Sequence, residues 1–177
     1  FTDIYAPYGL PNSLPKSFGG FNNELNYGPV TISAFLQFDY GRVLYNNMNR
    51  NLSRKGDAQF NSIKWYYENR WQYEGHQTTV PRPYNNAAER GSARGDLAST
   101  RYLEDASYIR LKNINLTYNL NGDWLSKVYA KNARISLQAN NLHTWTKFTG
   151  YDPEYNSQNT GLLPVMRSYF INLQLDF

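Results

Sequence analysis

The chain lacks cysteine altogether among its 177 residues. No disulfide framework and no thiolate metal site can therefore stabilise its fold. It also lacks any hydrophobic run close to the ~18 to 20 apolar residues of a membrane-spanning helix, and its mean hydropathy is -0.69. A helical membrane protein is thus excluded. A membrane β-barrel is not excluded, because lumen-facing polar residues dilute the hydropathy of its strands.

Charged residues are scarce as well, at 18% of the sequence against roughly a quarter in soluble globular domains. The net charge of +4 comes from scattered Lys and Arg residues. The basic stripe that nucleic-acid binding needs is missing, so no nucleic-acid partner is expected. Aromatic residues, in contrast, make up 16% of the chain. This mixture is typical of a surface that lies partly in a lipid interface.

The last residues of the chain alternate between apolar and polar side chains. Tyr169, Ile171, Leu173, Leu175 and Phe177 fall on one face, which is the period of a strand with one apolar side. A closing strand of about ten residues that ends in Phe is usual in bacterial outer-membrane barrels. The pattern therefore favours a barrel strand at this end of the chain.

The same alternation recurs in four earlier segments. In one of them the apolar positions change parity between Leu111 and Ile114, and we expect a β-bulge near Lys112 or Asn113 to restore the phase. The fold class predicted is all-β and antiparallel. The predicted strands are residues 17–27, 30–42, 106–120, 133–141 and 168–177.

The connections between these strands alternate in length. Short turns are expected around Gly28 and at residues 121–132, whereas the extracellular loops are predicted at about 46–105 and 142–167. The first long loop is largely irregular, with a short helix expected at residues 62–72. Short periplasmic turns and long extracellular loops are typical of outer-membrane barrels.

Five strands are too few to close a barrel, which needs about eight. In lipid every strand edge must also be paired, because an unsatisfied backbone group is costly there. The chain begins with Phe1 and no signal-like apolar run follows it. We therefore expect a segment that starts mid-protein and completes its sheet with strands from elsewhere, either in a longer chain or in a separate piece.

Five motifs, at residues 15–20, 70–71, 81–82, 102–114 and 139–154, occur in order over nearly the whole chain. Together they resemble motifs of SusC/RagA-type TonB-dependent transporters. Residues 102–114 read Tyr-Leu-Glu-Asp-Ala-Ser-Tyr-Ile-Arg-Leu-Lys-Asn-Ile, which is similar to a strand signature of that family. Residues 139–154 are similar to its block ending in Gly-Tyr-Asp-Pro-Glu. The chain departs from the family pattern at two positions. Ala106 stands where the family has Gly, and His143 stands where the family often has an aromatic residue. The shorter matches are residues 15–20, 70–71 and 81–82.

The resemblance implies the C-terminal portion of a transmembrane barrel of about 22 strands in the outer membrane of a Gram-negative bacterium. It also implies import of oligosaccharides or peptides, energised through TonB, beneath a SusD-like surface lipoprotein. The plug domain and the TonB-contacting region are absent from this chain. Membrane lipid and the remainder of the barrel are expected partners, and a homodimer of the transporter stays open. No cofactor is implied.

Five residues are candidates for substrate binding under this interpretation. Asp39 and Arg110 are expected to face the lumen near the extracellular ends of their strands, above the plug. Trp65, Trp71 and Trp145 are expected in the extracellular loops. Their rings could stack on sugar rings or pack under the lipoprotein, and simple loop packing is the alternative.

The sequence offers little for catalysis or metal binding. His76 and His143 lie far apart and have no second ligand at helical or strand spacing. Asp152 and Glu154 flank Pro153 in a turn-like motif, whereas an acid/base pair needs a concave site and tuned pKa values. The protein is therefore not expected to be an enzyme.

Two rival interpretations remain at this point. An aromatic-rich β-sandwich that binds carbohydrate would need turn signals about every 8 to 12 residues, which the long segment at residues 46–105 contradicts. A small autonomous barrel would need more strands than the five predicted, unless strands lie within that segment.

Overall fold

The computed structural model describes residues 13–53, 61–82, 100–127, 129–155 and 163–177. The chain divides into two compact units. The sheet unit consists of Leu14–Arg42, Ala106–Lys147 and Leu163–Phe177. The loop unit consists of the described residues within Phe1–Ser13, Val43–Asp105 and Phe148–Leu162.

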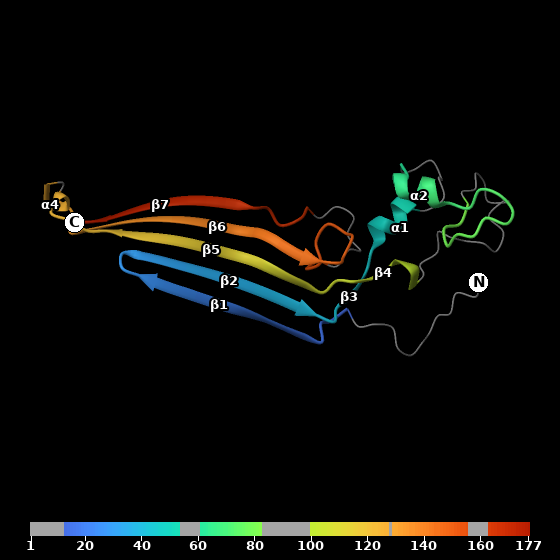
Figure 1. Ribbon diagram of the computed structural model, residues 1–177, viewed down its shortest axis with the longest axis horizontal. Helices are drawn as coiled ribbons and strands as arrows, with labels where there is room; N and C mark the ends of the chain where they lie inside the picture. Colours follow the sequence, from blue (N-terminus) through green and yellow to red (C-terminus); the bar gives the residue numbers. More distant parts are fainter. Residues whose placement is uncertain (1–12, 54–60, 83–99, 128, 156–162) are drawn as a thin grey trace. The chain divides into compact units, whose positions relative to one another are not determined.

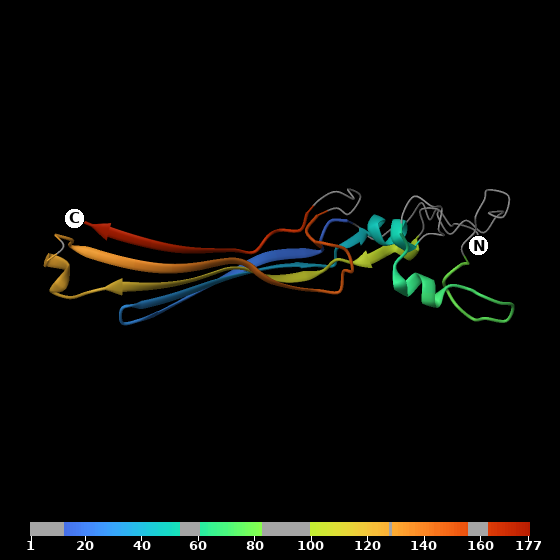
Figure 2. The same cartoon turned by 90° about the horizontal axis from the view of Figure 1, so that it is seen from above.

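The sheet unit is one antiparallel sheet of five strands in the order β1-β2-β5-β6-β7 (Figure 1). Seen from above, these strands form a single twisted layer (Figure 2). Within the sheet unit the described residues form no second sheet of the kind that packs face to face in a β-sandwich. The strands are β1 (Ser17–Tyr27), β2 (Val30–Tyr40), β5 (Tyr108–Leu120), β6 (Asn132–Thr146) and β7 (Ser168–Asp176).

The strand bounds follow the predicted ones closely, except at β6. That strand continues to Thr146, so the prediction that the extracellular loop begins at residue 142 is wrong. The ladder extends because Thr144 and Thr146 pair with Arg110 and Tyr108 of β5. Strand β2 ends at Tyr40, two residues earlier than predicted. The next residue, Gly41, has a φ of +77°.

Rows of side chains across the sheet alternate between apolar and polar. Leu25, Ile32, Leu116, Leu137 and Ile171 are paired in one row that crosses all five strands. The adjacent row on the other face contains Asn26, Thr31, Thr117, Ser136 and Asn172. All five members of the apolar row are exposed in this chain. The sheet unit thus has an apolar face whose described side chains are exposed and a polar face opposite it.

A bulge interrupts the pairing near the middle of β5, as the change of parity predicts. Leu111 pairs with Leu36 of β2 while Asn113 pairs with Phe35, which leaves Lys112 as the extra residue. The register also shifts against β6 at this level, where Asn141 adopts a φ of +54°. These irregularities restore the phase of the apolar positions on both sides of the bulge.

Short connections join β1 to β2 and β5 to β6 at one end of the sheet. Gly28, with a φ of +56°, turns the chain between β1 and β2. The connection from β5 to β6 contains one helical turn, α4 (Trp124–Lys127). Leu125 packs with Ala130 and Ala133 there in a small buried cluster. The compact connection predicted for residues 121–132 is confirmed.

The loop unit contains more regular structure than the irregular segment predicted. Strands β3 (Val43–Tyr45) and β4 (Leu103–Asp105) pair with each other. Three short helices accompany them, namely α1 (Asn47–Ser53), α2 (Lys64–Asn69) and the 3₁₀ helix η1 (Thr100–Tyr102). Helix α2 lies inside the predicted helical segment. Among the described residues no helix is long and apolar enough to cross a membrane.

The loop unit also buries apolar side chains of its own. Leu44, Tyr66, Val80 and Tyr102 are almost completely buried. The Tyr102 ring packs edge-on against Tyr45, with 6.0 Å between ring centroids. Sequence periodicity did not reveal this core because its members come from short elements far apart in the chain.

Candidate functional site

The outer ends of β2 and β5 bring two sequence-predicted candidates onto the polar face. Asp39 pairs with Tyr108, and Gln37 pairs with Arg110. These side chains share one face because the residues at i and i+2 of a strand point the same way. Only 5% of Asp39 and 2% of Arg110 are exposed. The candidate site is therefore a cluster of largely buried polar side chains.

Hydrogen bonds connect the cluster across three strands. The Nε of Arg110 donates to the hydroxyl oxygen of Thr144 on β6 at 2.8 Å. Its guanidinium carbon also lies 5.2 Å from the centroid of the Tyr108 ring, within cation–π range. The Tyr108 hydroxyl in turn accepts a hydrogen bond from Nε2 of Gln37 at 2.9 Å. Arg110 is thus contacted by Thr144 of β6 and by Tyr108 of its own strand, and Gln37 of β2 in turn holds Tyr108.

The carboxylate in the cluster has a cationic partner of its own. Arg42 and Asp39 form an ion pair of 2.9 Å between Nη2 and Oδ2. Because Asp39 is 95% buried, as its 5% exposure shows, removing Arg42 would leave a charge with reduced solvation. The two guanidinium groups and the one carboxylate of the cluster sum to a net positive charge. Such a cluster attracts carboxylates and other electron-rich groups through its field.

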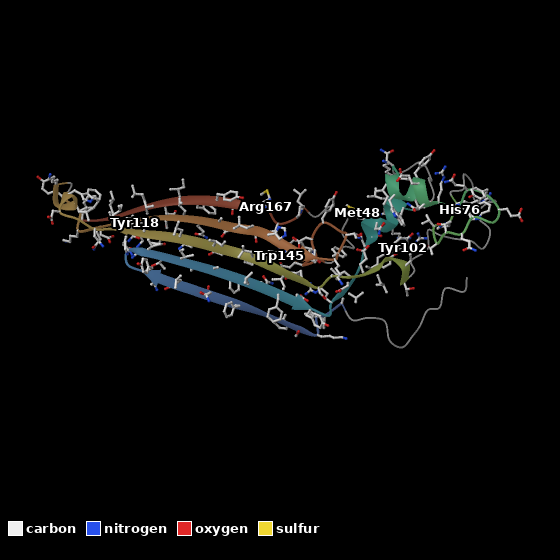
Figure 3. The ribbon with its side chains drawn as sticks, in the orientation of Figure 1. Met48, His76, Tyr102, Tyr118, Trp145 and Arg167 are labelled. Atoms are coloured by element: carbon white, nitrogen blue, oxygen red, sulfur yellow. The ribbon has the colours of Figure 1, made fainter. Side chains whose placement is uncertain are left out.

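Trp145 lies on the opposite face of the sheet from Asp39 and Arg110. Trp145 is in β6 and pairs with Ile109 of β5. Its ring packs edge-on against that of His143, with 4.6 Å between ring centroids. The expectation that Trp145 belongs to an extracellular loop is wrong, because β6 continues past it. Figure 3 places Trp145 toward one end of the sheet and Tyr118 toward the other. Rings at both ends of an apolar face are typical of membrane interfaces.

Trp65 and Trp71 belong to the loop unit. Trp65 lies on α2 and is half-exposed. Trp71 is partly buried, and its backbone N–H donates to the carbonyl oxygen of Val80 at 2.9 Å. These two candidates therefore belong to the loop unit, whereas Asp39 and Arg110 belong to the sheet unit.

Sequence reasoning missed Thr144, Tyr108 and Arg42 as members of the cluster. Thr144 was assigned to a loop because the irregularity at Asn141 hides the alternation of β6. Arg42 lies three residues after Asp39, just beyond the end of the strand. This spacing indicates an ion pair, but the apolar–polar alternation of the strand does not reveal it.

The described residues give no support to catalytic or metal chemistry at the other candidates. Oδ1 of Asp152 accepts a hydrogen bond from the backbone N–H of Glu154 at 2.9 Å, the geometry of an Asx turn. His76 stacks on Tyr73. No group of three or more His, Asp or Glu residues able to hold a metal ion occurs in the part of the chain that the structure describes.

Comparison with known proteins supplies an independent line of evidence. No family model matches the chain. TonB-dependent receptor P26 of Formosa agariphila is 33% identical, over 95% of this chain and 16% of that receptor. TonB-dependent receptor SusC of Bacteroides thetaiotaomicron is 28% identical over 49% of this chain and 9% of its own length.

The fold gives the same result. A structure of the RagAB peptide importer in a closed-closed state matches 93% of this chain and 18% of its own, with a TM-score of 0.79 and 28% identity. The class of protein is therefore the TonB-dependent receptor, and the sheet is part of a transmembrane β-barrel. Within this class the chain is similar to SusC and to the RagAB importer. It spans about one sixth of the length of P26, given the 16% coverage of that relative.

Proposed function

We propose that the protein containing this chain imports oligosaccharides or peptides across the outer membrane of a Gram-negative bacterium. It does so with a SusD-like surface lipoprotein and with energy delivered through TonB, and it performs no catalysis. The observation that carries the proposal is the match to RagAB, at a TM-score of 0.79 over 93% of this chain. That structure is of a peptide importer, which favours peptides among the two substrate classes.

The two faces of the sheet support this function. The exposed apolar row from Leu25 to Ile171 suits contact with lipid, and the polar rows suit a hydrated lumen. The strands at both edges, β1 and β7, have one unpaired side each within the described sheet. Strands from the remainder of a barrel of about 22 strands would satisfy those backbone groups.

The substrate-facing residues proposed are Asp39 and Arg110 in the sheet unit, with Trp65 and Trp71 in the loop unit. Because the two charged side chains are nearly buried, they would act through the field they create and through the polar neighbours they orient. The half-exposed ring of Trp65 could contact a ligand directly. Trp145 is better suited to the lipid interface than to substrate contact, because it lies on the apolar face.

The experiment that tests the function uses the full-length transporter together with its lipoprotein, purified from outer membranes in detergent. Mass spectrometry of the copurifying small molecules should detect peptides or oligosaccharides. Uptake by intact cells is then measured with two probes, fluorescein-labelled tryptic peptides of serum albumin and fluorescein-labelled malto-oligosaccharides. We expect the cells to take up one of the two probes, and we expect this uptake to stop when a protonophore collapses the proton gradient. Gradient-independent entry of both probes would contradict TonB-driven import.

The β-sandwich alternative makes a different prediction for the isolated chain. A carbohydrate-binding sandwich would unfold cooperatively in water, whereas part of a membrane barrel should not, because its apolar face and its strand edges lack partners. Circular dichroism of residues 1–177 during heating distinguishes these outcomes. A single sharp transition of a soluble monomer would favour the sandwich.

A further inference from the structure

The carboxylate of Glu104, on β4 in the loop unit, joins three segments of the chain. Its Oε1 accepts hydrogen bonds from Nδ2 of Asn46 at 3.0 Å and from Nδ2 of Asn49 at 3.1 Å. Its Oε2 accepts from the backbone N–H of Thr149 at 2.9 Å. The Thr149 hydroxyl also lies within hydrogen-bond distance of both oxygens, at 2.9 and 2.8 Å. One side chain thus contacts the start of α1 and the segment that follows β6 in sequence.

The donors around Glu104 require a carboxylate. Each oxygen faces at least one N–H group that can only donate, and an ionised carboxylate is an acceptor at both oxygens. A Gln side chain at this position would carry an NH₂ group in place of one oxygen. In either orientation that NH₂ would face a donor, so Gln is nearly isosteric with Glu but chemically mismatched here.

Asn46 makes this arrangement rigid. It is 1% exposed, and its backbone N–H donates to the carbonyl oxygen of Tyr102 at 2.7 Å. Its Oδ1 accepts from the backbone N–H of Asn49 at 2.8 Å, which orients the amide so that Nδ2 faces Glu104. Nδ2 also lies 3.0 Å from the Thr149 hydroxyl. The side chain of Asn46 is therefore fully used within the unit.

The segment that Glu104 holds has one buried and one exposed side. Phe148 is buried, and a Cβ at Gly150 would clash with its ring. Asp152 is also buried, in the turn with Glu154. Tyr151, in contrast, is 65% exposed. Glu104 therefore holds a segment whose exposed aromatic side chain is Tyr151.

We propose that Glu104 is a positioning residue that latches residues 148–155 to β4 and α1. The latch holds the segment carrying Tyr151 in a preformed arrangement before any ligand arrives. Such preorganisation lowers the entropic cost of binding at the exposed surface. This role goes beyond import itself and holds for whichever substrate is carried, since all of its contacts lie inside the loop unit.

The test is hydrogen–deuterium exchange of the full-length transporter in detergent, read by mass spectrometry of peptides covering residues 147–155. The variant is Glu104→Gln, and the matched control is Glu74→Gln, an exposed Glu in the same unit at the Tyr73–His76 turn. The Thr149 amide should exchange about tenfold faster or more in Glu104→Gln, because its hydrogen bond is lost in one orientation of the Gln amide and loses its charge assistance in the other. The control should exchange as the parent protein does, and peptides from β5 and β6 should be unchanged.

A second variant covers the case in which Glu104→Gln fails to assemble. Thr149→Val removes the hydroxyl contacts to Glu104 and Asn46 but keeps the backbone N–H. Faster exchange confined to residues 147–155 is expected, by a smaller factor than in Glu104→Gln. The proposal would be overturned if residues 147–155 exchange at the parent rate in a variant that assembles. It would also be overturned if exchange rises equally in β5 and β6. Neither result would bear on substrate import, which the uptake experiment tests separately.

Discussion

Arg110 on β5 donates a hydrogen bond from Nε to the hydroxyl oxygen of Thr144 on β6, at 2.8 Å. The two residues are directly paired in the register. They meet on the polar face because the irregularities at Lys112 and Asn141 restore the phase of both strands beyond the bulge. A backbone irregularity thereby determines which face carries the buried cation of the candidate site.

Replacing Arg110 by Ala should weaken ligand binding without preventing assembly in the membrane. The loss of the guanidinium removes a positive charge that attracts an anionic ligand, worth ~2 kcal/mol for a unit charge at about 8 Å and an effective dielectric constant of about 20. Isothermal titration calorimetry on the purified transporter–lipoprotein complex, with the ligand that copurifies, measures the change. Unchanged affinity would remove Arg110 from the substrate site.

Replacing Thr144 by Val should weaken the same binding through Arg110. The matched control is Thr146→Val on the same face, because the Thr146 hydroxyl donates to the Ser107 carbonyl oxygen. A double-mutant cycle is decisive: Thr144→Val should cost ~0.5 to 1.5 kcal/mol of binding free energy in the parent and almost nothing in the Arg110→Ala background. Equal costs in both backgrounds would show that Thr144 acts independently.

An Arg on the apolar face should destabilise the barrel far more than an Arg on the polar face. Leu173 pairs with Ile135 on the apolar face, and Leu173→Arg should cost about 2 to 4 kcal/mol near the membrane midplane. Asn172→Arg is a suitable control because it pairs with Ser136, whereas Gln174 pairs with Arg134 and would add charge repulsion. Equilibrium refolding into lipid vesicles measures both. Equal costs would mean that the two faces are assigned the wrong way round.

A methyl group at Gly20 should destabilise the pairing of β1 with β2. A Cβ there would lie 2.6 Å from the Phe35 ring, whereas at Gly19 it would lie 3.0 Å from the Phe38 ring. Gly20→Ala should therefore cost ~1 to 3 kcal/mol, and Gly19→Ala less. The stabilities of the two variants are ranked by the temperature at which the folded barrel loses its characteristic mobility in gel electrophoresis. Phe35→Leu should restore part of the stability lost in Gly20→Ala, and no such rescue would argue against the ring contact.

Asn141 offers a test of the β6 irregularity. Its φ of +54° suits Gly and Asn but strains other residues. Both Asn141→Gly and Asn141→Ala lose the hydrogen bond from Nδ2 to the Met166 carbonyl oxygen. The Ala variant should be less stable than the Gly variant by about 1 kcal/mol, measured in the same refolding assay. A more stable Ala variant would show that the left-handed conformation does not persist in the membrane.

The strands and their faces could be predicted from the sequence because a sheet with one apolar side imposes a period of two residues on the chain. From Val30 to Tyr40 and from Ser168 to Asp176 every second residue is apolar, although Phe35 and Phe170 also stand on the other face. The two strands were therefore predicted to within two residues. The parity change after Leu111 likewise located the bulge. The candidates Asp39 and Arg110 followed from the same alternation.

The outer end of β6 and the internal structure of the loop unit were beyond such reasoning. The irregularity at Asn141 shifts the phase of β6, so Trp145 was assigned to a loop and to the wrong surroundings. The contacts of Glu104 join residues up to 58 positions apart in sequence, as for Asn46, and short elements leave no periodic trace.

The sequence by itself determined the period of the strands, their two faces and the alternation of short and long connections, because each is a local consequence of apolar and polar residues in order. Only the tertiary structure decided which strands are neighbours, how β5 and β6 meet across their bulge, and that Thr144 reaches Arg110 and Thr149 reaches Glu104. Those contacts depend on register and on chain segments far apart in sequence, where one residue of slip moves a side chain to the other face of the sheet.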